Sequence, residues 1–194
     1  MNASNTQELC TPGAETRGQP KSPGKSVASL LNQAMRELAA QPNALFIGQG
    51  VEYPGVATYR DLEGIPMEQR LEWPVAENLQ LGACIGLSLQ GYLPISIFPR
   101  CDFLLLALDQ LVNHLEKLEE MSRGQYKPKV IVRTKVGSKW PLDAGPQHTN
   151  DHAEAFRLML TNVSVVQIAS KDDIIPAYRQ ALESPRSSLV IEAL

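Results

Sequence analysis

Five short apolar runs alternate along the chain with longer stretches of helical pattern, and this alternation constrains the fold more than any other feature. The runs are rich in β-branched residues and bounded by Gly, Pro or polar residues, as buried parallel strands are. They are residues 44–47, 95–98, 130–132, 163–166 and 188–191. The helical stretches lie near 76–90, 102–121, 151–160 and 171–183. Strand and helix in turn predict an α/β fold, with a doubly wound, mainly parallel sheet and helices on both faces.

The first part of the chain differs from the rest in composition. Residues 1–25 are polar and Pro-containing, with almost no large apolar side chain, so we expect a disordered tail. A helix is expected to start near Ser26, a good cap, and residues 26–194 are expected to form one domain. Pro176 leaves the start of the last helix uncertain.

Charge and cysteine usage exclude several classes of partner. The net charge of −3 and the pI near 5.7 give no reason to expect nucleic acid or an anionic membrane. No apolar stretch reaches the ~18 residues of a membrane span, and the N-terminus lacks a signal-peptide pattern. Cys10, Cys84 and Cys101 have neither zinc-site nor disulfide spacing. We therefore expect a cytoplasmic protein with reduced thiols.

One carboxylate, Glu77, lies at the start of an expected helix that is apolar and carries glycine. Apolar residues at positions 76, 79, 83, 85, 86 and 89 leave little polar surface around it. The simpler interpretation is a first-turn carboxylate stabilised by the helix dipole. The alternative is a buried functional acid, and the local pattern alone favours the simpler interpretation.

Five blocks of sequence occur in an order and spacing that point to one enzyme family. They are the loop segments 47–51 and 54–58, residues 75–94 around Glu77, 102–103, 109–113 with Lys117, and 145–149. Together they resemble the pyrimidine-binding domain of transketolases and of the β-subunits of 2-oxo-acid dehydrogenases, which are thiamine-diphosphate enzymes. The resemblance covers about residues 45–192 and implies the same α/β fold.

The resemblance also implies a role for each of three side chains. In such enzymes a carboxylic acid must act on N1′ of the aminopyrimidine of thiamine diphosphate, and Glu77 stands at that position. Phe103 matches the aromatic residue that stacks on the aminopyrimidine. His148 matches the active-site histidine that faces the substrate end of the cofactor and stabilises or protonates the reaction intermediate.

Other interpretations of these residues stay open. Phe103 starts an apolar run and could be an ordinary helix core residue, with Asp102 as the helix cap. His148 and His152, four residues apart, could bind a metal across a helix start, but a third ligand is lacking. His114 is expected to be a partly buried structural histidine.

The glycine-rich loop 48–50 follows an expected strand, as a dinucleotide fingerprint does. Tyr53 stands where the third glycine belongs, and Pro54 prevents an immediate helix, so we reject that interpretation. The resemblance makes the loop an edge of the thiamine cleft, with Gln49 and Gly50 as cofactor-binding residues. Dehydrogenase β-subunits usually have Glu where this chain has Gln49. Because an amide cannot relay a proton, this chain differs from them in the later proton transfers.

Nothing in the sequence resembles the diphosphate-binding domain of the family, where a Gly-Asp-Gly segment and an Asn hold magnesium. We therefore expect a partner subunit that holds the diphosphate and Mg²⁺, in a heterotetramer of two α and two β chains, and no metal site within this chain. The relatives continue into a further domain beyond the position of Leu194, so we expect a stand-alone pyrimidine-binding subunit that is active only with its partner.

Three functions follow from the resemblance. Decarboxylation of a 2-oxo acid with transfer of the acyl unit is favoured, because the blocks at 109–110 and 145–148 look more like dehydrogenase β-subunits than transketolases. Transketolase-like ketol transfer or carboligation is the alternative. A non-catalytic scaffold or regulatory domain is the third, and the joint presence of Glu77, Phe103 and His148 argues against it.

Overall fold

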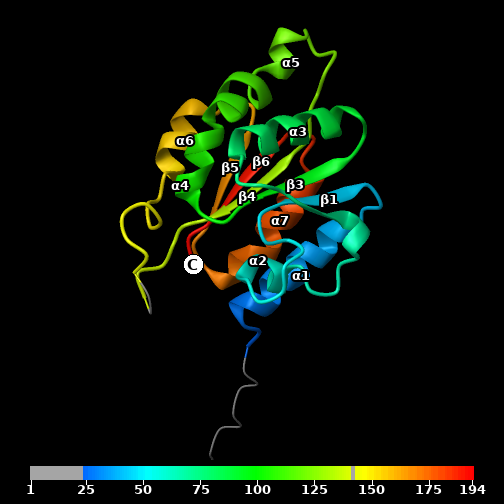
Figure 1. The fold of residues 1–194 in the computed structure, drawn as a ribbon. Coiled ribbons are helices and arrows are strands. Elements are labelled where there is room, and N and C mark those ends of the chain that lie inside the picture. Colours follow the sequence, from blue (N-terminus) through cyan, green and yellow to red (C-terminus); the bar gives the residue numbers. More distant parts are fainter. Residues whose placement is uncertain (1–23, 141–142) are drawn as a thin grey trace, which may run out of the picture.

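A single parallel sheet forms the centre of the computed structural model, which describes residues 24–140 and 143–194 (Figure 1). Within these residues the sheet has six strands in the order β2-β1-β3-β4-β6-β5, and every neighbouring pair is parallel. The strands are β1 (Ala44–Gly48), β2 (Arg70–Glu72), β3 (Leu93–Phe98), β4 (Ile131–Lys135), β5 (Ser164–Ile168) and β6 (Ser188–Glu192). The predicted doubly wound α/β fold is confirmed.

Helices cover both faces of the sheet. The α-helices are α1 (Val27–Ala39), α2 (Ala57–Asp61), α3 (Glu77–Leu89), α4 (Cys101–Leu104), α5 (Leu118–Met121), α6 (Ala153–Met159) and α7 (Ile174–Glu183). The shorter segments are the 3-10 turns η1 (Met67–Gln69), η2 (Leu105–Ala107) and η4 (Lys171–Asp173), and the π-helix η3 (Asp109–Leu115). Helices α1, α2 and α7 lie on one face, and α3, α4 and α6 lie on the other (Figure 1).

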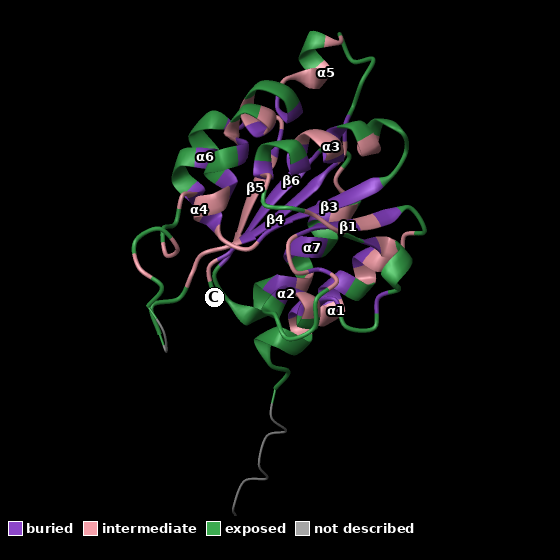
Figure 2. Ribbon diagram, in the orientation of Figure 1, coloured by how far each residue is buried: buried purple, intermediate pink, exposed green. Residues whose placement is uncertain are grey.

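The strands divide their side chains between two apolar cores. Phe46 and Ile97 face the core under α1 and α7, whereas Ile47 and Phe98 face the core under α3 and α6. This alternation follows from the period of two along a strand. The central strands are therefore buried on both sides (Figure 2), which explains why their sequences are continuous apolar runs.

The order of the strands positions the candidate site. From β1 the chain first adds β2 on one side, and then β3 pairs with the other side of β1. This is a topological switch point, and in open parallel sheets ligands bind outside the carboxyl ends of the strands at such a point. The loops that follow β1 and β3 start at Gln49 and Pro99 and meet there.

The structure differs from the sequence-based expectations in three places. The short elements β2 and α2 were not expected, and the expected helix 102–121 is divided into α4, η2, η3 and α5. No Gly or Pro occurs in that stretch, so the pattern carries no sign of the breaks. Pro176 is the third residue of α7, where its missing N–H has no intrahelical partner to lose.

Other expectations are answered only in part. The expected tail, residues 1–25, lies almost entirely outside the described residues, as does Cys10. Cys84 and Cys101 are buried free thiols. Among the helices of the described residues, none has the length and apolar character needed to cross a membrane.

Candidate active site

Glu77 is the first residue of α3 and is buried, with only 6% of its surface exposed. Its neighbours differ from the expected ones, because α3 turns Gln80, Leu81 and Cys84 inward and leaves Leu79 61% exposed. Within the described part of the chain, no hydrogen bond or ion pair engages the Glu77 carboxylate. Its oxygens are not among the fully enclosed atoms that lack a partner, so the carboxylate reaches the surface of the domain, where a ligand can meet it.

Gln80, one turn after Glu77, fixes the start of α3 against the sheet. Its side-chain amide is 1% exposed and donates to the carbonyl oxygens of Ile47 and Ile97 and to Ser96 Oγ, at 3.3, 3.1 and 3.1 Å. These bonds tie α3 to the carboxyl ends of β1 and β3. They hold Glu77 beside the switch point.

Glu72, which the sequence analysis did not single out, organises the loop after β1. Its carboxylate accepts hydrogen bonds from the backbone N–H groups of Gly50, Val51 and Glu52, at 2.7, 2.8 and 3.1 Å. Gly50 has φ +73°, a conformation that favours glycine. The shape of the loop that carries Gln49 is therefore set by the edge strand β2.

Phe103 and His148 lie together. Their ring centroids are 5.4 Å apart and the rings meet edge to face at 79°. Phe103 is half-buried at the start of α4, so it is not the ordinary core residue of the alternative interpretation. His148 Nδ1 is buried and has no partner among the described residues. A cavity of about 340 Å³ is lined by Phe103 and by residues on either side of His148 in the sequence.

The backbone around His148 is tightly packed against Gly137. A Cβ on residue 137 would lie 1.8 Å from the His148 carbonyl oxygen and 3.3 Å from Arg100 Nε. The first distance leaves no space for a side chain. Because residue 137 is glycine, both the His148 carbonyl group and the Arg100 side chain can pack against the backbone there.

The structure does not give Asp102 and His114 the roles that were expected from the sequence. Asp102 makes no cap for α4. Its carboxylate instead accepts a hydrogen bond from the Asn150 amide and lies 3.7 Å from His152 Nε2. His114, expected to be partly buried, is exposed and lies 3.5 Å from Asp109. The described residues contain no cluster of three His, Cys, Asp or Glu side chains suited to a metal ion.

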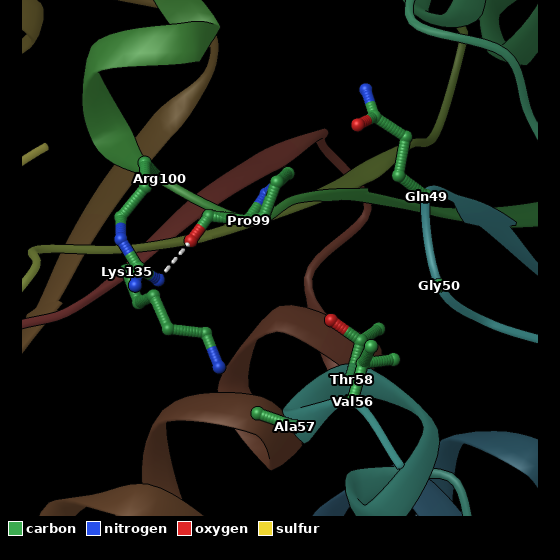
Figure 3. Close-up of a pocket in the computed structure, with 8 residues that line it drawn as sticks. All are labelled: Gln49, Gly50, Val56, Ala57, Thr58, Pro99, Arg100 and Lys135. Carbon is green, nitrogen blue, oxygen red and sulfur yellow. Dashed lines mark hydrogen bonds between the residues drawn. The ribbon is translucent and has the colours of Figure 1, made fainter. Parts of the chain in front are cut away.

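A second cavity, of about 320 Å³, opens at the carboxyl ends of β1, β3 and β4 (Figure 3). Gln49 and Gly50 border it, together with two cations that the sequence analysis missed, Arg100 and Lys135. The remaining lining residues are Val56, Ala57, Thr58 and Pro99. Within the described residues no direct contact joins this cavity to Glu77.

A cluster of buried charged side chains lies next to this cavity, and Lys135 belongs to both. Arg133, 1% exposed, donates to Glu192 at 2.7 Å and to Asp61 at 2.5 Å, and Tyr178 donates to Glu192 at 2.5 Å. Burial opposes ionisation of Glu192, but the Arg133 guanidinium outweighs it and holds the pKa of that carboxyl below its usual value.

Lys135 Nζ lies 3.7 Å from Asp61. Burial, and after it the nearby Arg133 charge, lowers the pKa of Lys135. A sequence signal existed, since Arg133 and Lys135 occupy alternate positions that continue the apolar run 130–132.

The polar groups gathered outside the carboxyl ends of the central strands define a ligand-binding α/β domain. The sequence matches the family described as "Transketolase, pyrimidine binding domain" over residues 24–193, and the chain belongs to that family. The family assignment made from the sequence is confirmed.

Proteins of known function with similar sequences are β-subunits. The chain is 26% identical over 172 residues to the 3-methyl-2-oxobutanoate dehydrogenase subunit beta of Mycobacterium tuberculosis, covering 86% of this chain and 48% of that protein. It is 27% identical over 173 residues to the mitochondrial pyruvate dehydrogenase E1 component subunit beta-2 of Oryza sativa, covering 86% and 45%. The chain therefore spans about half the length of the curated relatives it matches.

A solved structure described as "Split gene transketolase, inactive beta4 tetramer" has the same fold. Its TM-score is 0.66 at 17% identity, and the match covers 85% of this chain and 50% of that one. At this identity the likeness concerns the fold alone.

The described residues fit the aminopyrimidine half of thiamine diphosphate. Glu77 offers a carboxylate with no partner among the described residues, and His148 offers a buried ring nitrogen with none. Phe103 offers an aromatic ring at the border of a cavity.

Proposed function

We propose that this chain is the pyrimidine-binding subunit of a two-component, thiamine-diphosphate-dependent enzyme that decarboxylates a 2-oxo acid and transfers the acyl unit. The observation that carries the proposal is Glu77, a buried residue at the start of α3 whose carboxylate has no partner within the described residues. When bound, thiamine diphosphate would supply the nucleophilic carbon and the electron sink for cleavage next to a carbonyl group.

In this proposal Glu77 holds and exchanges a proton at N1′ of the aminopyrimidine. The position suits this role, because no hydrogen-bond partner within the described residues competes with N1′ for the carboxylate. Gln80 keeps the acid in place through its three bonds to the ends of β1 and β3. The energetic burden of burying Glu77 is then offset by the ligand.

Phe103 would stack on the aminopyrimidine and also position His148, which would act at the substrate side. The edge-to-face contact with Phe103 restricts the His148 ring, and its unpartnered Nδ1 is available to a ligand. A histidine in that setting can donate or accept a proton near neutral pH. Gln49 and Gly50 would form the opposite edge of the cleft, held by Glu72.

We propose that the diphosphate and Mg²⁺ are held by a partner subunit, in a heterotetramer of two α and two β chains. Support comes from the names of the relatives, which are subunits of larger enzymes. The isolated chain is then expected to bind the cofactor weakly. A cytoplasmic location stays a prediction from the sequence.

A second candidate function is ketol transfer or carboligation. Gln49 favours it, because the amide at this cavity cannot relay a proton as a carboxylate would.

The test begins with the tagged chain isolated from its native cells. Mass spectrometry identifies co-purifying proteins, and the complex is assayed for thiamine diphosphate and for turnover of 2-oxo acids. We expect a stoichiometric partner, bound cofactor, and turnover that falls at least about 100-fold in Glu77→Gln. Glu68→Gln, at an exposed position of η1, is the matched control. A complex without cofactor, or full turnover by Glu77→Gln, would overturn the proposal.

A further inference from the structure

The cavity at the switch point is bordered by two cations that enter from one side (Figure 3). Arg100 lies between β3 and α4, directly before Cys101, and Lys135 is the last residue of β4. Gln49, Val56 and Thr58 border the cavity on the other side in that view. None of the lining side chains is acidic.

One of the two cations, Lys135, belongs to the buried group of charges next to the cavity, where its charge is balanced by carboxylates. Arg133 and Lys135 supply two positive charges, and Asp61 and Glu192 supply two negative ones, so this group is neutral as a whole. Tyr178 stays neutral, because burial and the nearby Glu192 charge raise its pKa. Lys135 is the weakly held member, since its ammonium is 3.7 Å from Asp61.

Arg100 is the cation that this group leaves uncompensated. Its Nη1 donates to the Pro99 carbonyl oxygen at 2.8 Å, and its buried Nε has no partner among the described residues. No carboxylate of the described chain lies within ion-pair distance of it. The guanidinium is half-buried, and its Nη2 makes no hydrogen bond within the described residues, so that end is available to an anion from outside the chain.

The position of Arg100 relates the cavity to the proposed reaction. Gly137 packs against both Arg100 Nε and the His148 carbonyl oxygen, so the cavity and the His148 segment are neighbours. An anion held by Arg100 and Lys135 would therefore belong to the substrate.

That anion is not the carboxylate that departs as carbon dioxide. Decarboxylation removes the charge of this group, so cations that hold it would stabilise the ground state more than the transition state and slow the reaction. Cations that hold a second, distant carboxylate keep their partner throughout, and their binding energy serves to orient the substrate.

We propose that Arg100 and Lys135 bind the distal carboxylate of a 2-oxo dicarboxylic acid, which makes a dicarboxylate the preferred substrate class. The inference rests on the proposed function and deepens it. One surplus positive charge suits a monoanionic carboxylate better than a phosphate dianion, and Val56, Ala57 and Pro99 provide apolar contact for a short methylene chain. Pyruvate and 3-methyl-2-oxobutanoate, named for two relatives, have no such second charge.

The test compares two acids of the same length on the complex isolated from native cells. 2-Oxoglutarate carries the distal carboxylate, and 2-oxopentanoate lacks it. We expect kcat/KM for 2-oxoglutarate to exceed that for 2-oxopentanoate. Arg100→Gln and Lys135→Met should each reduce that preference ~10–100-fold, the value of a hydrogen bond to a charged group, while turnover of 2-oxopentanoate changes little. Lys127→Met, at an exposed cation before the amino end of β4, is the control.

A binding measurement separates this inference from the proposed function. Glutarate, butyramide and inorganic phosphate are titrated into the same complex by calorimetry, with no turnover required. Glutarate binding that is lost in Arg100→Gln supports the carboxylate site even if no 2-oxo acid reacts. Equal binding of glutarate and the uncharged butyramide, or an unchanged substrate preference in both variants of an active complex, overturns it. Phosphate binding in preference to glutarate overturns it in favour of a phosphorylated ketose.

Discussion

His148 meets the edge of Phe103 at 79°, with the ring centroids 5.4 Å apart. Phe103 lies in α4, which follows β3, and His148 lies in the loop between β4 and α6. The contact joins the two side chains that the sequence assigned to opposite ends of one cofactor. It makes the orientation of the histidine depend on the aromatic ring.

Phe103→Leu should weaken the site with little effect on the fold. Phe103 is half-buried, so the loss in unfolding free energy should stay below about 1 kcal/mol, while the edge contact is worth about 0.5–1.5 kcal/mol. We expect about a 2-fold to 10-fold weaker affinity of the complex for thiamine diphosphate, measured by titration of the apo-complex. Phe103→Tyr keeps the ring and should behave as wild type. Equal affinities for all three proteins would show that the ring does not contact the cofactor.

Gly137→Ala should separate Arg100 and His148. The added Cβ would lie 1.8 Å from the His148 carbonyl oxygen, so the loop must move. We expect kcat/KM to fall about 10-fold or more, because small displacements of catalytic groups are costly. Gly86→Ala is the matched control, since its Cβ meets nothing within 4 Å on α3 and should stabilise the helix by up to about 1 kcal/mol. Wild-type activity of Gly137→Ala would contradict the tight packing.

Lys135→Met should preserve or raise stability while it impairs anion binding. Burial lowers the pKa of Lys135 below its usual value of 10.5, so the unfolded chain binds its proton more tightly than the folded protein does. Its charge therefore opposes folding at neutral pH, and that opposition disappears as pH rises from the lowered pKa to 10.5. We expect an increase in unfolding free energy of up to about 1 kcal/mol at pH 7, and none above pH 10.5.

The contrasting change is Arg133→Met. It leaves Asp61 and Glu192 buried without their cation and should lower the unfolding free energy by about 3–5 kcal/mol. Urea unfolding of both variants provides the comparison. If Lys135→Met were destabilised as much as Arg133→Met, the cation would have a structural role in place of the binding role.

Glu116 should give the protein an acid-sensitive component of stability. Its buried carboxylate accepts hydrogen bonds from the backbone N–H groups of Thr161, Asn162 and Val163. Burial raises its pKa, but these bonds outweigh that effect and hold the pKa below the usual 4.5. The stabilisation is complete above pH 4.5 and is lost as pH falls through the lowered pKa.

Glu116→Gln should cost about 1–3 kcal/mol at pH 7. The difference from wild type should shrink as the pH is lowered, which melting curves from pH 7 to pH 3 would record. Glu119→Gln, which removes only a surface pair with Lys127, should be nearly neutral. A difference between wild type and Glu116→Gln that is constant with pH would exclude the charged form as the source.

The strands could be predicted from sequence because burial on both faces makes each a continuous β-branched run. The edge strand β2 has the sequence Arg70-Leu-Glu72 and carries no such run, since one of its sides has no neighbouring strand. The breaks between residues 101 and 121 were not predictable, because no Gly or Pro marks them and the stretch packs against α3, where Gln110 of η3 lies beside Gly82.

Candidate site residues were found by family resemblance, and the helical pattern alone would not have singled out Glu77. The pattern even assigned the wrong neighbours, since Leu79 is exposed and Gln80 is buried. Arg100 was missed because it is a single charge in the short connection between β3 and α4. Lys135 was missed because its alternation with Arg133, which continues an apolar run, was not used as a signal. Their meeting depends on the pairing of β3 with β4, which local sequence does not encode.

The most direct test of the central claim is the rate of hydrogen–deuterium exchange at C2 of thiamine diphosphate bound to the complex, measured by NMR after acid quench. If Glu77 acts on N1′, exchange in Glu77→Gln should be slower than in wild type and Glu68→Gln by ~100–10,000-fold, with the same amount of cofactor bound. Exchange as fast in Glu77→Gln as in wild type would contradict the account, because the buried carboxylate would then have no part in activating the cofactor.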